Sequence, residues 1–179
     1  FTNNTSASRV ENRNIPGDGK FDQSSTNSSI MNLYVGRIDV YDMPDIDSND
    51  SLLMKNYFIK DHAYRTLQKT YRMRCLVDDN FGYFGGDAFA QNGFRNGINL
   101  LGKDSVSTGH YFTDMQNSSY LWSYGCGGGW YQGASGVGTT ADFKTNVVQS
   151  VFTMLFGSYF GDWDNTNNFL RAPLASPTG

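Results

Sequence analysis

The pattern of apolar and polar positions changes several times along the chain, and each change marks a predicted element. Residues 1–30 are rich in Ser, Thr and Asn and show no period that could bury one face. They predict an extended polar arm or a long loop. Between Met31 and Val40, apolar residues alternate with polar ones on both sides of Gly36, which predicts a strand with a bulge at that glycine. We expect residues 31–179 to form one α/β domain.

A helical period follows the turn-rich residues 41–47. Apolar residues recur at steps of three and four from Asp50, the predicted N-cap, to Tyr71, the last residue of the pattern. The side chains expected on its buried face are Leu53, Tyr57, Tyr64, Leu67 and Tyr71. Another face carries basic side chains, which we interpret as a solvated surface of the helix: Lys55, Lys60, Arg65 and Lys69.

The rest of the chain alternates between predicted strands and one further helix. The strands are expected at residues 73–77, near Val106, and at residues 120–124 and 147–156, with a glycine-weakened helix at residues 87–101. Asp78 and Asp79 form a predicted acidic loop after the first of these strands. The continuous apolar run at the end of residues 147–156 is typical of a strand covered on both faces. This alternation predicts an α/β layered sheet of mostly parallel strands flanked by helices.

Composition and charge argue against several classes of function. The chain has 179 residues, of which 39% are hydrophobic and 15% aromatic, so one domain with a packed core is expected. A net charge of −3 argues against nucleic acid or an anionic membrane as a partner, because both need a concentrated positive field. No apolar run approaches the roughly 20 residues that a membrane span requires. The richness in Gly, Asn, Ser and Thr favours an extracellular, periplasmic or cell-surface location.

Candidate chemistry lies in a glycine-rich loop after residues 120–124. Cys126 stands there between Gly125 and Gly127, where backbone amides could stabilise a developing oxyanion and the thiol could act as a nucleophile. His110 is the candidate base. The alternative is a flexible turn that happens to contain a thiol. A bridge between the only two cysteines, Cys75 and Cys126, is neither required nor excluded by their spacing.

Two further groups of residues could serve a site. Ser158, in the loop after the last predicted strand, is a weaker nucleophile candidate because its surroundings do not match the nucleophile elbow. Gly125 and Gly127 are expected to line a cleft for a peptide or glycan. One or two of Trp122, Trp130 and Trp163 could floor it, and core packing is the alternative for these tryptophans. Calcium could take hard oxygen ligands from acidic loops, which capping and turn formation explain equally well. The acidic residues in question are Asp18 and Asp22, and then Asp42, Asp45 and Asp47.

The stretch Met-Asn-Leu-Tyr-Val-Gly-Arg-Ile-Asp-Val at residues 31–40, followed by a helix, resembles the corresponding stretch of the gingipain family. These are cysteine peptidases with a caspase-like fold, and the similarity covers roughly residues 15–175. In that family one strand leads to a Gly-His-Gly turn with the catalytic histidine, and the next leads to a Cys-x-x-Gly turn with the nucleophile. The corresponding turns here are Gly-Cys-Gly, with Cys126, and Ser-Tyr-Phe-Gly, with Ser158.

The resemblance implies a caspase-like sheet that is incomplete in this chain, with both positions of the catalytic dyad substituted. A cysteine cannot replace imidazole as a base near neutral pH, and an unassisted serine is a weak nucleophile. We therefore expect a gingipain-like domain of an exported protein that serves binding or assembly. Its expected partners are other segments of a longer polypeptide, neighbouring subunits, or a peptide or glycan. The alternative is a cysteine peptidase or related hydrolase with Cys126 as its nucleophile.

Overall fold

The computed structural model describes residues 36–81, 88–162 and 164–178. Contacts divide the chain into residues 1–37 and residues 38–179, and the second unit holds all of the helices and strands described below. The predicted polar arm and the first half of the predicted strand at Met31–Val40 lie outside the described residues. The prediction of the second half of that strand is wrong, because residues 36–40 form no strand. The chain turns locally instead, where the Tyr41 amide donates to Asp39 Oδ1 at 3.1 Å.

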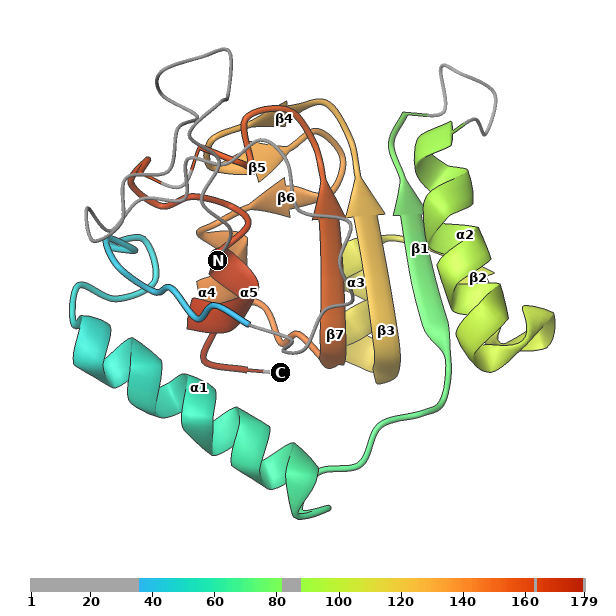
Figure 1. Ribbon diagram of the computed structural model, residues 1–179, viewed down its shortest axis with the longest axis horizontal. Coiled ribbons are helices and arrows are strands. Elements are labelled where there is room, and N and C mark those ends of the chain that lie inside the picture. The colour runs from blue at the N-terminus through green and yellow to red at the C-terminus, as the bar shows by residue number, and fades with distance from the viewer. Residues whose placement is uncertain (1–35, 82–87, 163, 179) are drawn as a thin grey trace, which may run out of the picture. The chain divides into compact units, whose positions relative to one another are not determined.

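A four-stranded, all-parallel sheet forms the centre of this unit (Figure 1). The strand order is β2-β1-β3-β7, so each new strand is added beside an earlier one after a crossover. Their bounds are β1 (Cys75–Asp79), β2 (Val106–Thr108), β3 (Tyr120–Cys126) and β7 (Ser150–Phe156). The predicted α/β class and the parallel arrangement are confirmed.

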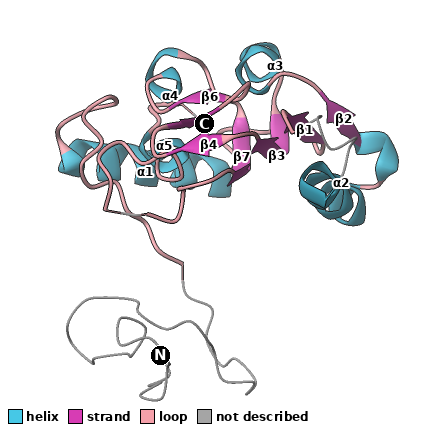
Figure 2. Cartoon of the chain, turned by 90° about the horizontal axis from the view of Figure 1, so that it is seen from above, coloured by secondary structure: helices cyan, strands magenta, loops and turns pink. Residues whose placement is uncertain are grey.

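Helices cover both faces of the sheet (Figure 2). The crossover from β1 to β2 contains α2 (Ala88–Leu101), and the connection from β2 to β3 contains α3 (Tyr111–Asn117). On the α2 face, Cys75 packs against Gly97, where an added Cβ would lie 2.9 Å from its Sγ. On the opposite face, Leu76 shares a cluster with Tyr111 of α3. Successive residues of β1 therefore enter two separate hydrophobic clusters, as the pleat of a strand requires.

A small antiparallel sheet and several short helices were not predicted from the sequence. The glycine-rich segment after β3 forms β4 (Gly129–Trp130), β5 (Gly133–Ala134) and β6 (Gly138–Thr139). The remaining short elements are the 3₁₀ turn η3 (Lys103–Ser105), α4 (Asp142–Thr145) and α5 (Ala172–Ala175). Glycine is required where β5 and β6 pair, because a Cβ on Gly133 would lie 2.7 Å from the carbonyl oxygen of Gly138.

The first helix lies where it was predicted, but it begins and ends at other residues than predicted. The helix α1 (Asp50–Arg65) has Asn49 as its N-cap, whose side chain accepts from the Leu52 amide at 3.1 Å. The helix stops well before Tyr71, because the chain turns through a positive φ of 58° at Leu67. Within α1 only Leu53 is fully buried.

Lys60 does not belong to a solvated face of α1, contrary to prediction. Its ammonium is largely buried and donates to backbone carbonyls near the end of the described chain. The nearest acceptors are the carbonyl oxygens of Ser176 at 2.6 Å and Pro173 at 3.1 Å. These contacts join α1 to α5 and to the residues that follow it.

Two other expectations about strands are wrong. Asp78 and Asp79 do not form a loop after β1 but are its last two residues, paired with Gly125 and Cys126 of β3. β7 is not covered on both faces. Within the described chain it pairs only with β3, and its residues Phe152 and Phe156 are exposed. An apolar run alone does not distinguish an edge strand from a central one.

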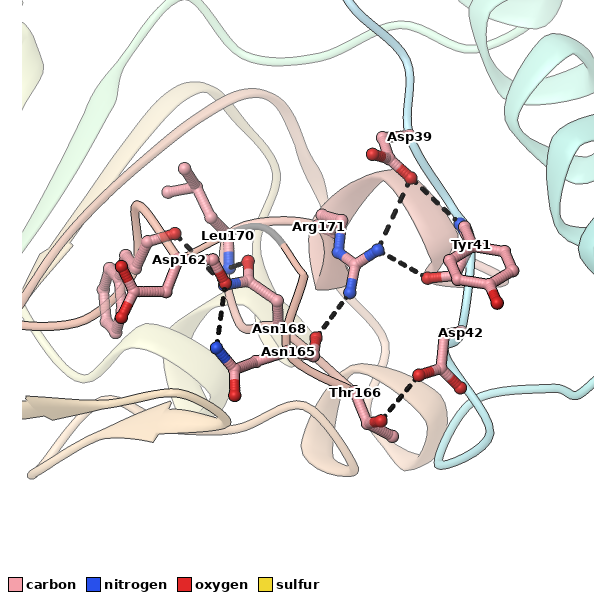
Figure 3. A network of polar contacts seen from close by, with 10 residues as sticks. Asp39, Tyr41, Asp42, Asp162, Asn165, Thr166, Asn168, Leu170 and Arg171 are labelled. Carbon is pink, nitrogen blue, oxygen red and sulfur yellow. Dashed lines mark hydrogen bonds and ion pairs between the residues drawn. The ribbon is translucent and has the colours of Figure 1, made fainter. Parts of the chain in front are cut away.

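A buried arginine connects segments that are far apart in the sequence (Figure 3). Arg171 is 1% exposed. Its guanidinium donates to the carbonyl oxygens of Tyr41 and Asn165, each at 2.6 Å, and to Asp39 Oδ1 at 3.4 Å.

The described residues contain no helix that is long and apolar enough to cross a membrane.

Candidate functional site

The carboxyl ends of three parallel strands meet at one edge of the sheet. Register places Asp79 of β1 beside Cys126 of β3, and Cys126 beside Phe156 of β7. The loops that follow β3 and β7 are in contact. The Gly127 amide donates to the Phe156 carbonyl at 3.2 Å, and a Cβ on Gly129 would lie 2.5 Å from the amide nitrogen of Ser158. This edge is where α/β sheets gather their chemistry, and it brings the two sequence-predicted loops together.

Cys126 is the last residue of β3 and its thiol is fully buried. It packs with Val77 and Tyr124 on the α2 face. Its Sγ donates to Asp79 Oδ1 at 3.4 Å. Burial, reinforced by the Asp79 carboxylate, raises the pKa of Cys126 to about 12. At neutral pH the thiol is protonated, which makes it a poor nucleophile.

The second cysteine is in a similar state. Cys75 is fully buried on the same face of the sheet and is a free thiol, as is Cys126. Burial raises the pKa of Cys75 to about 11. In the register of β1 and β3, Cys75 is paired with Trp122 and Cys126 with Asp79, so the two thiols are held at opposite ends of these strands.

His110 lies at the same edge of the sheet but on the other face from Cys126. It is the exposed residue directly before α3, and its amide donates to Asp114 Oδ2 at 2.6 Å. Its side chain is close enough to Asp78 to lower the pKa of that carboxyl. Asp78 accepts from the α3 residue Tyr111, whereas its neighbour Asp79 contacts Cys126 on the α2 face. The structure therefore does not pair His110 with Cys126.

Asp78 is a residue of this edge that the sequence reasoning missed. Its carboxylate is buried and accepts from the Tyr111 amide at 2.8 Å and from Asn80 Nδ2 at 2.9 Å. Burial raises its pKa, while these two hydrogen bonds and His110 oppose that shift. The signal in the sequence was the presence of two acidic residues and an amide residue directly after a predicted buried strand. The two acidic residues belong to the strand itself because they pair with β3, and the apolar pattern does not reveal this pairing.

Ser158 stands in the turn after β7 and is exposed. The next residue, Tyr159, is 58% exposed and has a positive φ of 68°, an uncommon conformation for a bulky side chain. Its ring lies 5.2 Å from that of Tyr131, measured between centroids. Trp130 is also partly exposed. Aromatic side chains therefore cover part of the surface beside the two loops.

The two glycines predicted to line a cleft are buried. The calcium candidates do not form a site among the described residues. Gly125 packs between Val137 and Tyr111, and Gly127 lies against Asn80. Trp163, Asp18 and Asp22 lie outside the described residues. No group of three His, Cys, Asp or Glu side chains within the described ranges could hold a metal ion.

The three remaining calcium candidates each take part in a hydrogen bond within the protein. Asp42 Oδ2 accepts from Thr166 Oγ1 at 2.6 Å. The Asp45 amide donates to Asn167 Oδ1 at 2.9 Å. Asp47 Oδ1 accepts from the amide of the N-cap residue Asn49 at 2.8 Å. Turn formation accounts for the Asp47 contact, whereas the Asp42 and Asp45 contacts join this loop to the distant residues Thr166 and Asn167.

Comparison with known proteins found no matching family model, no matching curated protein and no matching solved structure. The resemblance to gingipains therefore stays a prediction that rests on the quoted residues.

Proposed function

We propose that this chain is a gingipain-like, caspase-like domain of an exported protein that lacks a working dyad and serves binding or assembly. The order of the parallel strands supports this proposal. The turns that contain Cys126 and Ser158 follow β3 and β7, which are neighbours in the sheet. These are the two positions that the resemblance assigns to the histidine and the nucleophile of the family.

The observation that carries the proposal is the state of Cys126. A residue at the base position must accept a proton near neutral pH, and a buried thiol with a pKa of about 12 does not. Ser158 has no base beside it in the positions that the family uses. The chain has only two histidines, of which His62 belongs to α1 and His110 lies near Asp78.

The alternative function, a hydrolase with Cys126 as nucleophile, requires an accessible thiolate. Catalytic cysteines have a lowered pKa and lie near a histidine, a positive charge or a helix N-terminus. Cys126 instead contacts the carboxylate of Asp79, which favours the protonated thiol. The observations therefore favour a domain that binds over a domain that cleaves.

Features of the surface support a role in binding or assembly. The exposed rings of Trp130, Tyr131 and Tyr159 offer flat apolar area with polar tips to a peptide or glycan. β7 presents the exposed side chains Phe152 and Phe156 at an edge that has no strand partner among the described residues. A strand edge of this kind is a place where another polypeptide segment can pair.

Peptide cleavage tests the proposal directly. The full chain, its Cys126→Ala and Ser158→Ala variants, and the matched control Cys75→Ala are incubated with a broad peptide library, and products are identified by mass spectrometry. We expect no cleavage above the buffer background in any sample. Cleavage by the wild type and by Cys75→Ala that disappears in Cys126→Ala or in Ser158→Ala would contradict the proposal.

A further inference from the structure

A groove of about 540 Å³ lies along α1 and is lined by none of the residues of the candidate site. Its lining residues are Met54, Lys55, Phe58, Ile59, His62, Ala63 and Gln68. Two of its apolar side chains are strongly exposed, Phe58 at 54% and Ile59 at 55%. We call this surface the α1 groove.

Phe58 and Ile59 do not serve the core of the domain, whereas Met54, at one end of the α1 groove, is partly buried and packs against it. The contact of α1 with the rest of the fold involves the buried side chain of Leu53 and the short helix α5. Met54 and Phe58, like Ile59 and Ala63, are four residues apart, so the members of each pair are neighbours on the helix surface, and both pairs line the groove. A contiguous exposed apolar stripe with a polar rim is typical of a surface that another polypeptide covers.

The charges around the α1 groove are basic. Lys55 and His62 are its titratable lining residues, and no acidic residue lines it. Residues 50–69 contain four basic and two acidic side chains, in a chain whose net charge is −3. Of the two acids, Asp61 is paired with Arg65 at 2.8 Å and Asp50 lies in the first turn of the helix. The groove therefore combines an apolar floor with one lysine at its rim, and none of its lining residues is acidic.

This charge pattern disfavours a second copy of the chain as the occupant. Two antiparallel copies of α1 that cross at Phe58 and Ile59 would place Lys55 of one against His62 of the other. Two parallel copies would place Lys55 against Lys55. Neither arrangement supplies a carboxylate to the lysine, and like charges across an interface oppose binding.

We propose that the α1 groove binds an amphipathic helical segment of another polypeptide, with apolar residues on one face and Asp or Glu beside them. Apolar anchors spaced at three and four residues match a stripe on a helix, and flanking carboxylates complement Lys55 and His62. The proposal goes beyond the function proposed above, since it concerns a different surface and does not depend on the absence of catalysis.

The test uses two defined probes. One is an 18-residue, fluorescein-labelled helical peptide of Leu, Ala and Glu, with Leu on one face, and the other has Lys in place of every Glu. Binding to the full chain is measured by fluorescence anisotropy. We expect saturable binding of the Glu peptide, with an affinity at least tenfold higher than that of the Lys peptide, and weaker binding at high salt because exposed charges are screened.

Variants locate the binding surface. Phe58→Glu should lower the affinity for the Glu peptide at least tenfold. The matched control is Leu100→Glu, which changes a residue of α2 that is 60% exposed and should leave binding unchanged. Lys55→Glu changes only the rim, so it should weaken the Glu peptide and strengthen the Lys peptide. This charge reversal keeps the test valid even if Phe58→Glu fails to fold.

Three outcomes would overturn the inference. The first is equal affinity for the two peptides, and the second is binding that Phe58→Glu and Lys55→Glu leave unchanged. The third is a dimer in sedimentation velocity that Phe58→Glu converts to a monomer, which would assign the groove to a second copy. Peptide cleavage by the chain would contradict the function proposed above and would leave this inference unaffected.

Discussion

At the scale of single residues, two basic side chains stabilise the fold by donating hydrogen bonds to backbone carbonyls of distant segments. Arg171 donates to the carbonyl oxygens of two distant segments, at Tyr41 and Asn165 (Figure 3). The ammonium of Lys60 likewise donates to the carbonyl oxygen of Ser176, in the segment that follows α5. Buried charges are tolerated when they are well bonded. Neither residue differs in the sequence from an ordinary surface base, so their roles could not be predicted from the pattern.

Lys60 predicts a pH dependence of stability. Burial, followed by the charge of Lys69, lowers the pKa of Lys60 from 10.5 to about 8. Between about pH 8 and pH 10.5 the unfolded chain therefore holds more protons than the folded chain, so the contribution of Lys60 to the free energy of unfolding rises with pH in this window. Below about pH 8 the penalty for burying the charge is constant.

Urea unfolding at pH 7.5 and pH 9.5 measures this contribution. Replacing Lys60→Met should remove the part of the pH-dependent rise that Lys60 supplies, whereas Lys55→Met, at an exposed position of the same helix, should retain it. An equal rise in Lys60→Met and in the wild type would show that Lys60 does not titrate as its burial requires.

At the scale of elements, the contact between the loops after β3 and β7 depends on one glycine. A Cβ on Gly129 would lie 2.5 Å from the amide nitrogen and 2.6 Å from the carbonyl oxygen of Ser158. Both are backbone atoms, so neither can move away without displacing the loop. By contrast, a Cβ on Gly128 would meet only Ser135 Oγ at 3.7 Å, an ordinary contact.

Alanine substitution at these two glycines tests the loop contact. Gly129→Ala should lower the free energy of unfolding by about 1–3 kcal/mol, the usual range for forced overpacking. Gly128→Ala, the matched control, should change it by less than about 0.5 kcal/mol, as expected for a substitution without a steric conflict. Thermal unfolding followed by circular dichroism reports both values. Equal effects of the two substitutions would contradict the close approach of Gly129 to Ser158.

Most elements with a long, regular pattern were predictable from the sequence, and most short ones were not; the three-residue strand β2 near Val106 was expected, whereas the helix α3 was missed. α1, α2, β1, β3 and β7 were expected close to their observed positions because each carries several apolar residues at one period. α4 and α5 have four residues each, and β4, β5 and β6 have two each, which is too short for a period to appear. The helix end at Arg65 was missed because the apolar spacing continues past the turn at Leu67.

At the scale of the whole described unit, alternation of strands and helices correctly predicted a parallel α/β sheet. The loops with Cys126 and Ser158, which each follow a predicted strand of this sheet, meet at one edge, as the contact of Gly129 with Ser158 indicates. What the pattern could not predict is which face each side chain of that edge occupies. His110 and Cys126 lie on opposite faces because Asp78 and Asp79, their respective neighbours, are consecutive residues of one strand.

We conclude that Cys126 is a buried, protonated thiol and not a nucleophile, and the rate of its alkylation measures this state. The native full chain is treated with iodoacetamide between pH 6 and pH 9, and labelling of Cys126 and Cys75 is followed by peptide mass spectrometry, with glutathione as an exposed reference thiol. Because burial raises both pKa values, to about 12 and about 11, we predict that both residues label far more slowly than glutathione at every pH and react fully only in urea. Faster labelling of Cys126 than of glutathione at pH 6, with Cys75 unlabelled, would contradict the account.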